Sequence, residues 1–341
     1  MTPRVSVLMP VRNGLPWLRE ALDGLARQTL ADLEIVALED GSTDGTAECL
    51  RAWPDERLRV IATGGVGMAR ALNIGLAAAR APFVARHDAD DVSAPIRMEA
   101  QLHYLLSHPA VDVVASTADY IDERGRPVAT DWVKTVRRQQ DVALTPREIA
   151  DLMPLTCCLT HGSVMARVEV LRAAGGYLPD IWPVEDYDLW LRLLPVAAIA
   201  KLPLRLYRYR VHDAQLSAQV RDDQLRQALA AKFRHLRRVV PDLPFPARLR
   251  IAGEGRGADV YRALAPEHGF EVTAAAPVPA DGAALDVAAV REASHEVCDL
   301  LVVANFADVE RHGRAFAAGP SRVRRIGNFF VPARAARQEA A

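Results

Sequence analysis

The sequence predicts an α/β protein with a mostly parallel central sheet, helices on both faces of that sheet, and a smaller α/β unit nearer the C-terminus. The first ninety residues alternate short β-branched apolar runs with longer segments of helical period. The 341 residues exceed the usual length of one domain. Three prolines fall within residues 241–246, where they would halt both helix and strand. We therefore predict a main domain at 1–240, a linker at 241–247 and a small domain at 248–341.

The first ninety residues are expected to place three polar clusters at one edge of the sheet. Strands are predicted at 5–9, 33–38, 58–62 and 83–86, with helices at 15–28, 46–51 and 67–79 between them. Strand–helix–strand crossovers make neighbouring strands parallel, and ligands bind beyond the carboxyl ends of such strands. The polar clusters that follow three of these strands are Arg12-Asn13-Gly14, Glu39-Asp40-Gly41-Ser42 and His87-Asp88-Ala89-Asp90-Asp91.

Further elements are predicted along the rest of the main domain. We expect helices at 96–106, 168–174, 185–194 and 219–240, and strands at 111–115, 119–128 with a turn at Gly125, 163–167 and 205–211. The sequence does not predict the three-dimensional arrangement of residues 116–160.

Charge and composition argue against a nucleic acid partner, a signal peptide and a membrane span. The 42 basic and 43 acidic residues nearly cancel, so no nucleic acid partner is expected. Residues 1–10 are too short an apolar run for a signal peptide, and no apolar run approaches the ~20 residues of a membrane span. We expect a cytoplasmic protein, with peripheral contact at the inner membrane face if its acceptor is lipid-linked.

The acidic run Asp88-Ala89-Asp90-Asp91 is the strongest candidate for chemistry. Three carboxylates in four residues repel one another unless a cation lies among them, and hard oxygen ligands suit Mg²⁺ or Mn²⁺. The alternative is a solvated acidic turn that caps the next helix.

Asp40 and Arg70 are candidates for nucleotide contacts. Asp40 could accept hydrogen bonds from a base or a ribose, although Ser42 and Asp44 could equally cap the following helix with no ligand present. Arg70, on the helix that begins near Gly67, could contact phosphate, or it could simply face solvent.

A series of motifs in order resembles the family 2 glycosyltransferases of the GT-A fold. The resemblance covers about residues 3–220. The motifs are Val5 to Gly14, Gln28-Thr29-Leu30, Glu39 to Thr46, Asp88 to Asp91, His161 to Met165, Glu185 to Arg192, and Tyr209-Arg210-Val211-His212.

This resemblance implies an inverting, metal-dependent transfer of a sugar from a nucleotide diphosphate donor, with uridine favoured, to a glycan or lipid-linked acceptor. A polysaccharide or surface-glycan pathway is the expected setting. Asp186 matches the general base and Glu185 would support it, whereas the residues alone favour first-turn acids at a helix start. The implied nucleotide contacts are Pro10, Arg12, Asn13, Asp40, Arg70 and Asp88, and the implied ligands of Mn²⁺ or Mg²⁺ are Asp88, Asp90, Asp91 and His212. His161 is a weaker candidate, because a single histidine is more often structural.

Two departures from the family pattern leave the nucleotide open. Arg12 stands where tyrosine is common, and Glu39 replaces the first of two aspartates. A nucleotidyltransferase is disfavoured because no glycine-rich basic loop follows the first strand. A non-catalytic protein that binds sugar nucleotides or assembles glycans remains the alternative.

The second unit and the helix before it have undecided roles. Residues 248–264 resemble the start of a Rossmann-like unit, but the glycine spacing at Gly253, Gly255 and Gly257 fits a cofactor fingerprint poorly. Regulation or docking is at least as good an interpretation. The basic helix at 219–240 could lie on anionic lipid, although a solvated helix is favoured.

Overall fold

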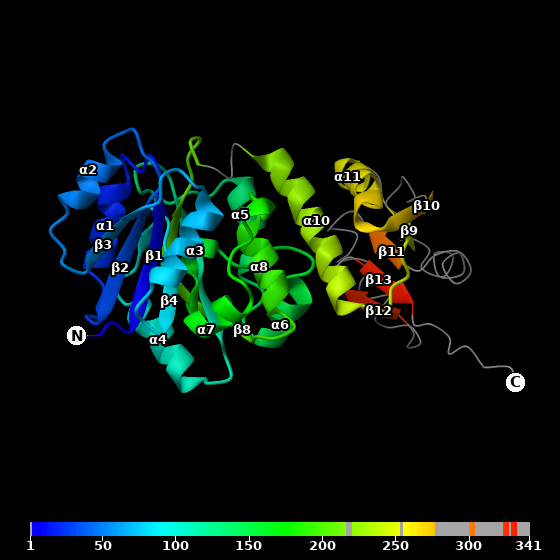
Figure 1. Ribbon diagram of the computed structural model, residues 1–341, viewed down its shortest axis with the longest axis horizontal. Coiled ribbons are helices and arrows are strands. Elements are labelled where there is room, and N and C mark those ends of the chain that lie inside the picture. Colours follow the sequence, from blue (N-terminus) through cyan, green and yellow to red (C-terminus); the bar gives the residue numbers. More distant parts are fainter. Residues whose placement is uncertain are drawn as a thin grey trace, which may run out of the picture. The chain divides into compact units, whose positions relative to one another are not determined.

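The computed structural model describes residues 2–215, 220–252, 255–276, 300–303, 323–326 and 329–332. Two compact units are present (Figure 1). The first contains Met1–Ala150 and Cys157–Arg221, and the second contains Asp151–Thr156 and Asp222–Ala341. The chain passes between them ahead of the proline-rich stretch, so the linker at 241–247 stays a prediction.

The first unit is built on a mixed, mostly parallel sheet with the strand order β3-β2-β1-β4-β7-β6-β8-β5. The strands β1 to β4, with β6 against β8, pair in parallel, whereas β7 and β5 pair antiparallel with their neighbours. The strands are β1 Val5–Val11, β2 Leu33–Glu39, β3 Leu58–Ala62, β4 Phe83–Arg86, β5 Val92–Ser93, β6 Val113–Ile121, β7 Met165–Arg167 and β8 Ile199–Arg210.

Helices cover both faces of this sheet, as the sequence predicts. Alternate side chains of β1, including Val7 and Met9, share one buried core with α1, α2 and α4. On the opposite face Gly75 of α3 lies so close that a Cβ there would be 2.7 Å from Leu38 Cδ1. The helices of the unit are α1 Leu18–Ala26, α2 Thr46–Arg51, α3 Met68–Ala78, α4 Arg97–Ser107, α5 Asp131–Gln140, α6 Pro146–Leu152, α7 Val168–Ala173 and α8 Glu185–Leu193, of which α6 runs across the division at residue 150.

Several predicted elements are wrong in the middle of the chain. The sequence predicts separate strands at 111–115 and 119–128, but β6 is one strand from Val113 to Ile121. Its register against β8 shifts around Thr117, and the pairing continues past the buried Ser116 and Thr117. The predicted turn at Gly125 is present, with φ +76°. Strand β8 begins six residues before the predicted 205–211, and α5 and α6 are not predicted at all.

The second unit contains a small five-stranded sheet with the order β10-β9-β11-β13-β12. Strand β9 is parallel to both β10 and β11, and a core formed with α10 includes Phe233, Leu236 and Ile251. Its elements are α10 Arg221–Val239, β9 Ala247–Ala252, α11 Arg256–Leu264, β10 Phe270–Ala276, β11 Leu300–Val303, β12 Val323–Ile326 and β13 Phe329–Pro332. Gly253 and Glu254 of the glycine-rich turn lie outside the described residues. Among the described helices, none is long and apolar enough to span a membrane.

Candidate active site

The loops that follow β1 and β2 are joined by hydrogen bonds in both directions. Asn13 adopts a left-handed conformation, φ +54°, and its side-chain oxygen accepts the N–H of Thr43 at 2.8 Å. Side chains of the second loop accept N–H groups of the first. These contacts are Asn13 N to Ser42 Oγ at 3.0 Å, Gly14 N to Thr46 Oγ1 at 2.8 Å and Leu15 N to Asp44 Oδ2 at 3.1 Å. The predicted helix-capping role of Asp44 is also present, since Asp44 Oδ1 accepts the N–H of Thr46.

Asp40 is buried at the end of β2 and organises the start of α3. Its carboxylate accepts hydrogen bonds from Thr63 Oγ1 at 2.6 Å, Val66 N at 2.8 Å and Gly67 N at 2.9 Å. Burial alone would raise the pKa of Asp40, but these hydrogen bonds outweigh it and lower that pKa. The carboxylate is therefore ionised and fixed, and contact with a base stays a prediction.

The other predicted nucleotide contacts differ in exposure. Pro10 is buried in β1, opposite Leu38 of β2, whereas Arg12 and Asn13 are exposed. The Arg70 side chain is 59% exposed and forms a long ion pair with Asp180 at 3.9 Å. Such an exposed pair contributes little energy, so Arg70 is free to face a ligand.

Asp88 opens the acidic turn and is held from two sides. The buried Arg86 guanidinium forms an ion pair with Asp88 Oδ1 at 2.7 Å, and the Tyr207 hydroxyl accepts the Asp88 N–H at 3.0 Å. Burial raises the pKa of Asp88, and Arg86 opposes that shift. Gly162 packs against this group, because a Cβ there would be 2.1 Å from the Tyr207 hydroxyl and 2.7 Å from Asp88 Oδ2.

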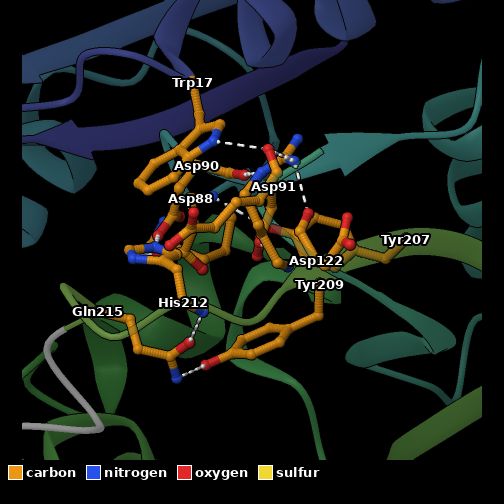
Figure 2. Close-up of polar contacts among 12 residues, drawn as sticks. Trp17, Asp88, Asp90, Asp91, Asp122, Tyr207, Tyr209, His212 and Gln215 are labelled. Atoms are coloured by element: carbon orange, nitrogen blue, oxygen red, sulfur yellow. Dashed lines mark hydrogen bonds and ion pairs between the residues drawn. The ribbon is translucent and has the colours of Figure 1, made fainter. Parts of the chain in front are cut away.

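Asp90 and His212 meet across the site. His212 Nε2 lies 3.0 Å from Asp90 Oδ2, and the imidazole ring lies against Trp17, with ring centroids 4.1 Å apart (Figure 2). The His212 N–H donates to Gln215 Oε1 at 3.0 Å. The sequence therefore grouped Asp90 and His212 correctly, although they stand 122 positions apart.

Asp91 points into the protein. It is 1% exposed, and its Oδ1 accepts the Arg210 N–H at 2.6 Å. Burial, followed by the charges of Asp90 and Asp88, raises the pKa of Asp91 well above its ordinary value. Asp91 supports the acidic turn from its buried side, through the contact with Arg210 of β8.

Arg210 ties the acidic turn to two other segments, a role that the sequence did not reveal. Its buried guanidinium donates to the Asp90 carbonyl at 2.7 Å and to Glu20 Oε2 at 2.6 Å. It also donates to the carbonyls of Asp122 at 3.0 Å and Glu123 at 3.2 Å. Arg86 and Trp17 were missed as well. A charged residue at the end of a buried apolar strand, as in Phe83-Val84-Ala85-Arg86, was the available signal for Arg86.

The donors around the turn suit a divalent cation, but they are not assembled into a closed shell. Among the residues that the structure describes, no three His, Cys, Asp or Glu side chains are arranged to hold a metal ion. Asp90 and His212 are paired, and the partly exposed Asp88 is engaged by Arg86 through one oxygen. Carboxylate oxygens and an imidazole nitrogen form a donor set that fits Mn²⁺.

An acid pair opens α8. Glu185 is 7% exposed and Asp186 is half-buried, so Asp186 is the more accessible carboxylate. Burial raises the pKa of Asp186 to about 6, while burial and then the charge of Asp186 raise the pKa of Glu185 to about 7. Arg86 lowers both pKa values and Asp88 raises both, which indicates that the acid pair lies within electrostatic range of the acidic turn.

Two further residues of the motifs have structural roles. Asp188 is buried and forms an ion pair with Arg192 at 2.7 Å. His161 Nε2 lies 3.0 Å from the Tyr177 hydroxyl, and burial lowers the pKa of His161 well below its ordinary value. The structural interpretation of His161 therefore fits its contacts better than the ligand interpretation.

Comparison with known proteins decides the family. The family model described as Glycosyl transferase family 2 matches residues 6–174. The amylovoran biosynthesis glycosyltransferase AmsE of Erwinia amylovora is 30% identical over 197 residues, which are 57% of this chain and 70% of that protein. The chain belongs to glycosyltransferase family 2. An uncharacterized glycosyltransferase of Haemophilus influenzae is 28% identical over 229 residues, 65% of this chain and 70% of that protein. In two longer Rickettsia relatives the match covers 36% and 31% of their length.

Solved structures confirm the GT-A type of fold for this glycosyltransferase. The mannosyltransferase PcManGT from Pyrobaculum calidifontis, in complex with GDP-Man and Mn²⁺, has a TM-score of 0.53 at 21% identity and covers 94% of this chain and 82% of its own. TarS 1–349 of S. aureus, in complex with UDP-GlcNAc, has a TM-score of 0.53 at 18% identity and covers 70% of this chain and 71% of its own. At these identities the likeness shows the fold, and function is argued from the site.

Proposed function

We propose that this glycosyltransferase is an inverting, metal-dependent enzyme that moves a sugar from a UDP-sugar to an acceptor hydroxyl. The observation that carries the proposal is the shared environment of the acidic turn and the acid pair. Arg86 forms an ion pair with Asp88, and the charge of Arg86 also lowers the pKa of Asp186. Donor phosphate and acceptor hydroxyl would thus meet between two sets of carboxylates.

Asp186 is the general base of the proposed reaction. As the acceptor oxygen attacks the anomeric carbon, Asp186 accepts the hydroxyl proton, while the bond from that carbon to the diphosphate oxygen breaks. One displacement inverts the anomeric centre and releases a nucleoside diphosphate. The Tyr187 N–H donates to Asp186 Oδ1 at 2.7 Å, which fixes the carboxylate. Glu185 is the more buried of the two acids, and in this proposal it supports Asp186 and does not contact the acceptor.

Asp88, Asp90 and His212 are the residues that would hold Mn²⁺ or Mg²⁺, with Asp91 supporting the turn. Such a cation supplies charge neutralisation at the diphosphate as the leaving group departs. The complex of PcManGT with Mn²⁺ supports this part of the proposal.

The joined loops after β1 and β2 form the proposed nucleotide side of the site. Asp40 would meet the base, Pro10, Arg12 and Asn13 would line the pocket, and Arg70 would face the phosphates. The UDP-GlcNAc complex of TarS supports a uridine donor, whereas PcManGT holds GDP-Man, so donors of both kinds belong in the test.

The proposed acceptor is a glycan or lipid-linked precursor in polysaccharide or surface-glycan synthesis. AmsE is described as a protein of amylovoran biosynthesis, which supports this setting. Work on a lipid-linked acceptor would take place at the membrane surface. Two basic side chains of helix α10 are engaged within the second unit, Arg226 by Glu267 and Lys232 by the Leu155 carbonyl.

The test is a screen of UDP-, GDP- and dTDP-sugars for Mn²⁺-dependent release of the nucleoside diphosphate. Wild type is compared with Asp90→Ala and Asp186→Asn, and with Asp131→Asn, whose side chain is 97% exposed, as the matched control. We expect release with a UDP-sugar, retained in Asp131→Asn and lost in the other two variants. Donor binding without turnover in any acceptor mixture would favour the alternative of a non-catalytic sugar-nucleotide-binding protein.

A further inference from the structure

Trp17 contacts the His212 imidazole at the proposed metal site. Trp17 lies in the loop between β1 and α1, and its ring centroid is 4.1 Å from that of His212, with the planes at 37° (Figure 2). The His212 side chain is 4% exposed. The imidazole is therefore enclosed, and Trp17 is one of the groups that enclose it.

Among the described residues, the second ring nitrogen of His212 has no hydrogen-bond partner of the kind that usually orients a metal-binding imidazole. A ligating histidine ordinarily donates its second ring nitrogen to a carboxylate, a carbonyl or water, which fixes the ring. Within the described part of the chain, His212 Nδ1 is buried without a hydrogen-bond partner. Gln215 binds the main-chain N–H of His212 and so holds the backbone, while the ring itself is held by Asp90 through Nε2 and by the face of Trp17.

Trp17 is itself held in place by hydrogen bonding and charge. Its indole Nε1 donates to the Glu123 carbonyl at 3.1 Å, and the Arg210 guanidinium lies 5.8 Å from the centre of the ring. Arg210 donates to that same Glu123 carbonyl and to the Asp90 carbonyl. The aromatic ring is thus fixed relative to the acidic turn.

We infer that Trp17 is a positioning residue that sets the orientation of the His212 imidazole for metal binding. This inference rests on the proposed function, in which His212 and Asp90 hold the cation. The loop that carries Trp17 also carries Arg12 and Asn13 of the proposed nucleotide side. Trp17 therefore lies between the proposed nucleotide loop and the proposed metal site.

The test measures Mn²⁺ binding directly, from the loss of the free Mn²⁺ electron paramagnetic resonance signal, with and without saturating UDP. We expect Trp17→Ala to weaken Mn²⁺ binding by about 10- to 100-fold, the range found when partners of metal ligands are removed. Trp17→Phe keeps a ring face but loses the bond to Glu123, and it should weaken binding less. Trp132→Ala is the matched control, since Trp132 is 46% exposed on α5.

A double-mutant comparison separates an effect through His212 from a general effect. In a His212→Ala background, Trp17→Ala should change Mn²⁺ binding no further, because its target is gone. Equal weakening in both backgrounds, or wild-type binding by a folded Trp17→Ala, would overturn the inference. Thermal melting of each variant checks the fold, and Trp17→Phe keeps the test decisive if Trp17→Ala does not fold.

Failure of this inference can be told apart from failure of the proposed function. If Asp90→Ala abolishes Mn²⁺ binding while His212→Ala leaves it unchanged, the role of Trp17 is overturned and the metal-dependent transferase stands. If wild type with UDP binds no Mn²⁺, both are overturned.

Discussion

In the proposed mechanism, the raised pKa of Asp186 suits proton transfer near neutral pH. Since burial raises this pKa to about 6, the carboxylate is ionised above pH 6 and able to accept a proton, and it is protonated below. We expect kcat/KM for sugar transfer to fall about tenfold per pH unit below that value. Nucleoside diphosphate release measured between pH 5 and 8 checks this.

Glu185→Gln provides the control for the pH profile. Burial raises the pKa of Glu185 to about 7, so Glu185 is largely protonated and neutral where Asp186 titrates. Replacement by the neutral glutamine should therefore leave the acidic limb where it is in wild type. A displaced limb in this variant would show that Glu185 contributes to the profile, against the assignment to Asp186 alone.

Gly162 is required by a close approach of side chains. A methyl group there would meet the Tyr207 hydroxyl at 2.1 Å and Asp88 Oδ2 at 2.7 Å, so the acidic turn would have to move. We expect Gly162→Ala to reduce kcat by at least about 100-fold, in line with the effect of ~1 Å displacements in active sites. Activity and thermal melting are measured together.

Gly175→Ala is the comparison for Gly162→Ala. Gly175 has φ +81° but no atom within 4 Å of an added Cβ, so it tests backbone strain alone. It should cost about 1–2 kcal/mol of stability and leave kcat unchanged. Wild-type kcat in Gly162→Ala would refute the tight packing around Asp88.

Strand β8 serves as the main support of the acidic turn. Tyr207 contacts Asp88, Arg210 contacts Asp90 and Asp91, and His212 follows two residues beyond the strand. Arg210→Met would remove the side-chain donor of the partly buried Asp90 and Asp122 carbonyls and the ion pair with Glu20, while the Glu123 carbonyl would keep Trp17 as a donor. We expect a loss of about 3 kcal/mol or more in the free energy of unfolding, measured by urea denaturation.

Arg210→Lys separates charge from geometry. Lysine keeps the charge beside Glu20 but cannot reach three carbonyls in the forked arrangement of a guanidinium. It should recover only part of the lost stability. Full recovery would indicate that the ion pair with Glu20, and not the carbonyl contacts, supports the turn.

The strands that the sequence predicts well are those buried by a regular pattern. β1 and β2 are mostly apolar runs between clear turns, and their predicted ranges agree with the structure to within two residues. β6 and β8 contain Ser116, Thr117, Lys201 and Pro203, which read as interruptions. The pairing of β6 with β8 accommodates interruptions by shifts of register. Such shifts depend on how two distant strands meet, so the local sequence does not predict them.

The residues of the candidate site likewise fall into those that the sequence could indicate and those that it could not. Motif order was enough to group Asp90 with His212, which the structure brings into contact, whereas the roles of Asp88 and Asp186 stay predictions. Trp17 and Arg210 could not be selected, because their contacts depend on how α1, β8 and residues 122–123 come together. Asp91 belonged to the correct motif, but only the structure shows that it faces Arg210 and not outward.

At the scale of the whole molecule, each compact unit has its own apolar core. A ligand that binds the first unit should stabilise it by mass action, about 2.7 kcal/mol at a concentration of 100 times Kd. We expect UDP with Mn²⁺ to raise the melting temperature of wild type, and chelation of the metal to reverse part of the shift. Differential scanning calorimetry measures both melting temperatures. As the control, the melting temperature of Asp90→Ala with UDP should not change when the metal is chelated.

The hydrogen bonds between the loops after β1 and β2 constrain how donor choice can be altered. Four of them join residues 13–15 to residues 42–46, and the side chains that accept or donate come from both loops. A chimaera that receives only one loop from a relative would lose partners for the other, and the proposed nucleotide side of the site would deform before its selectivity changed. The two segments form a single exchangeable cassette, to be transplanted together when the enzyme is re-engineered for a different nucleotide.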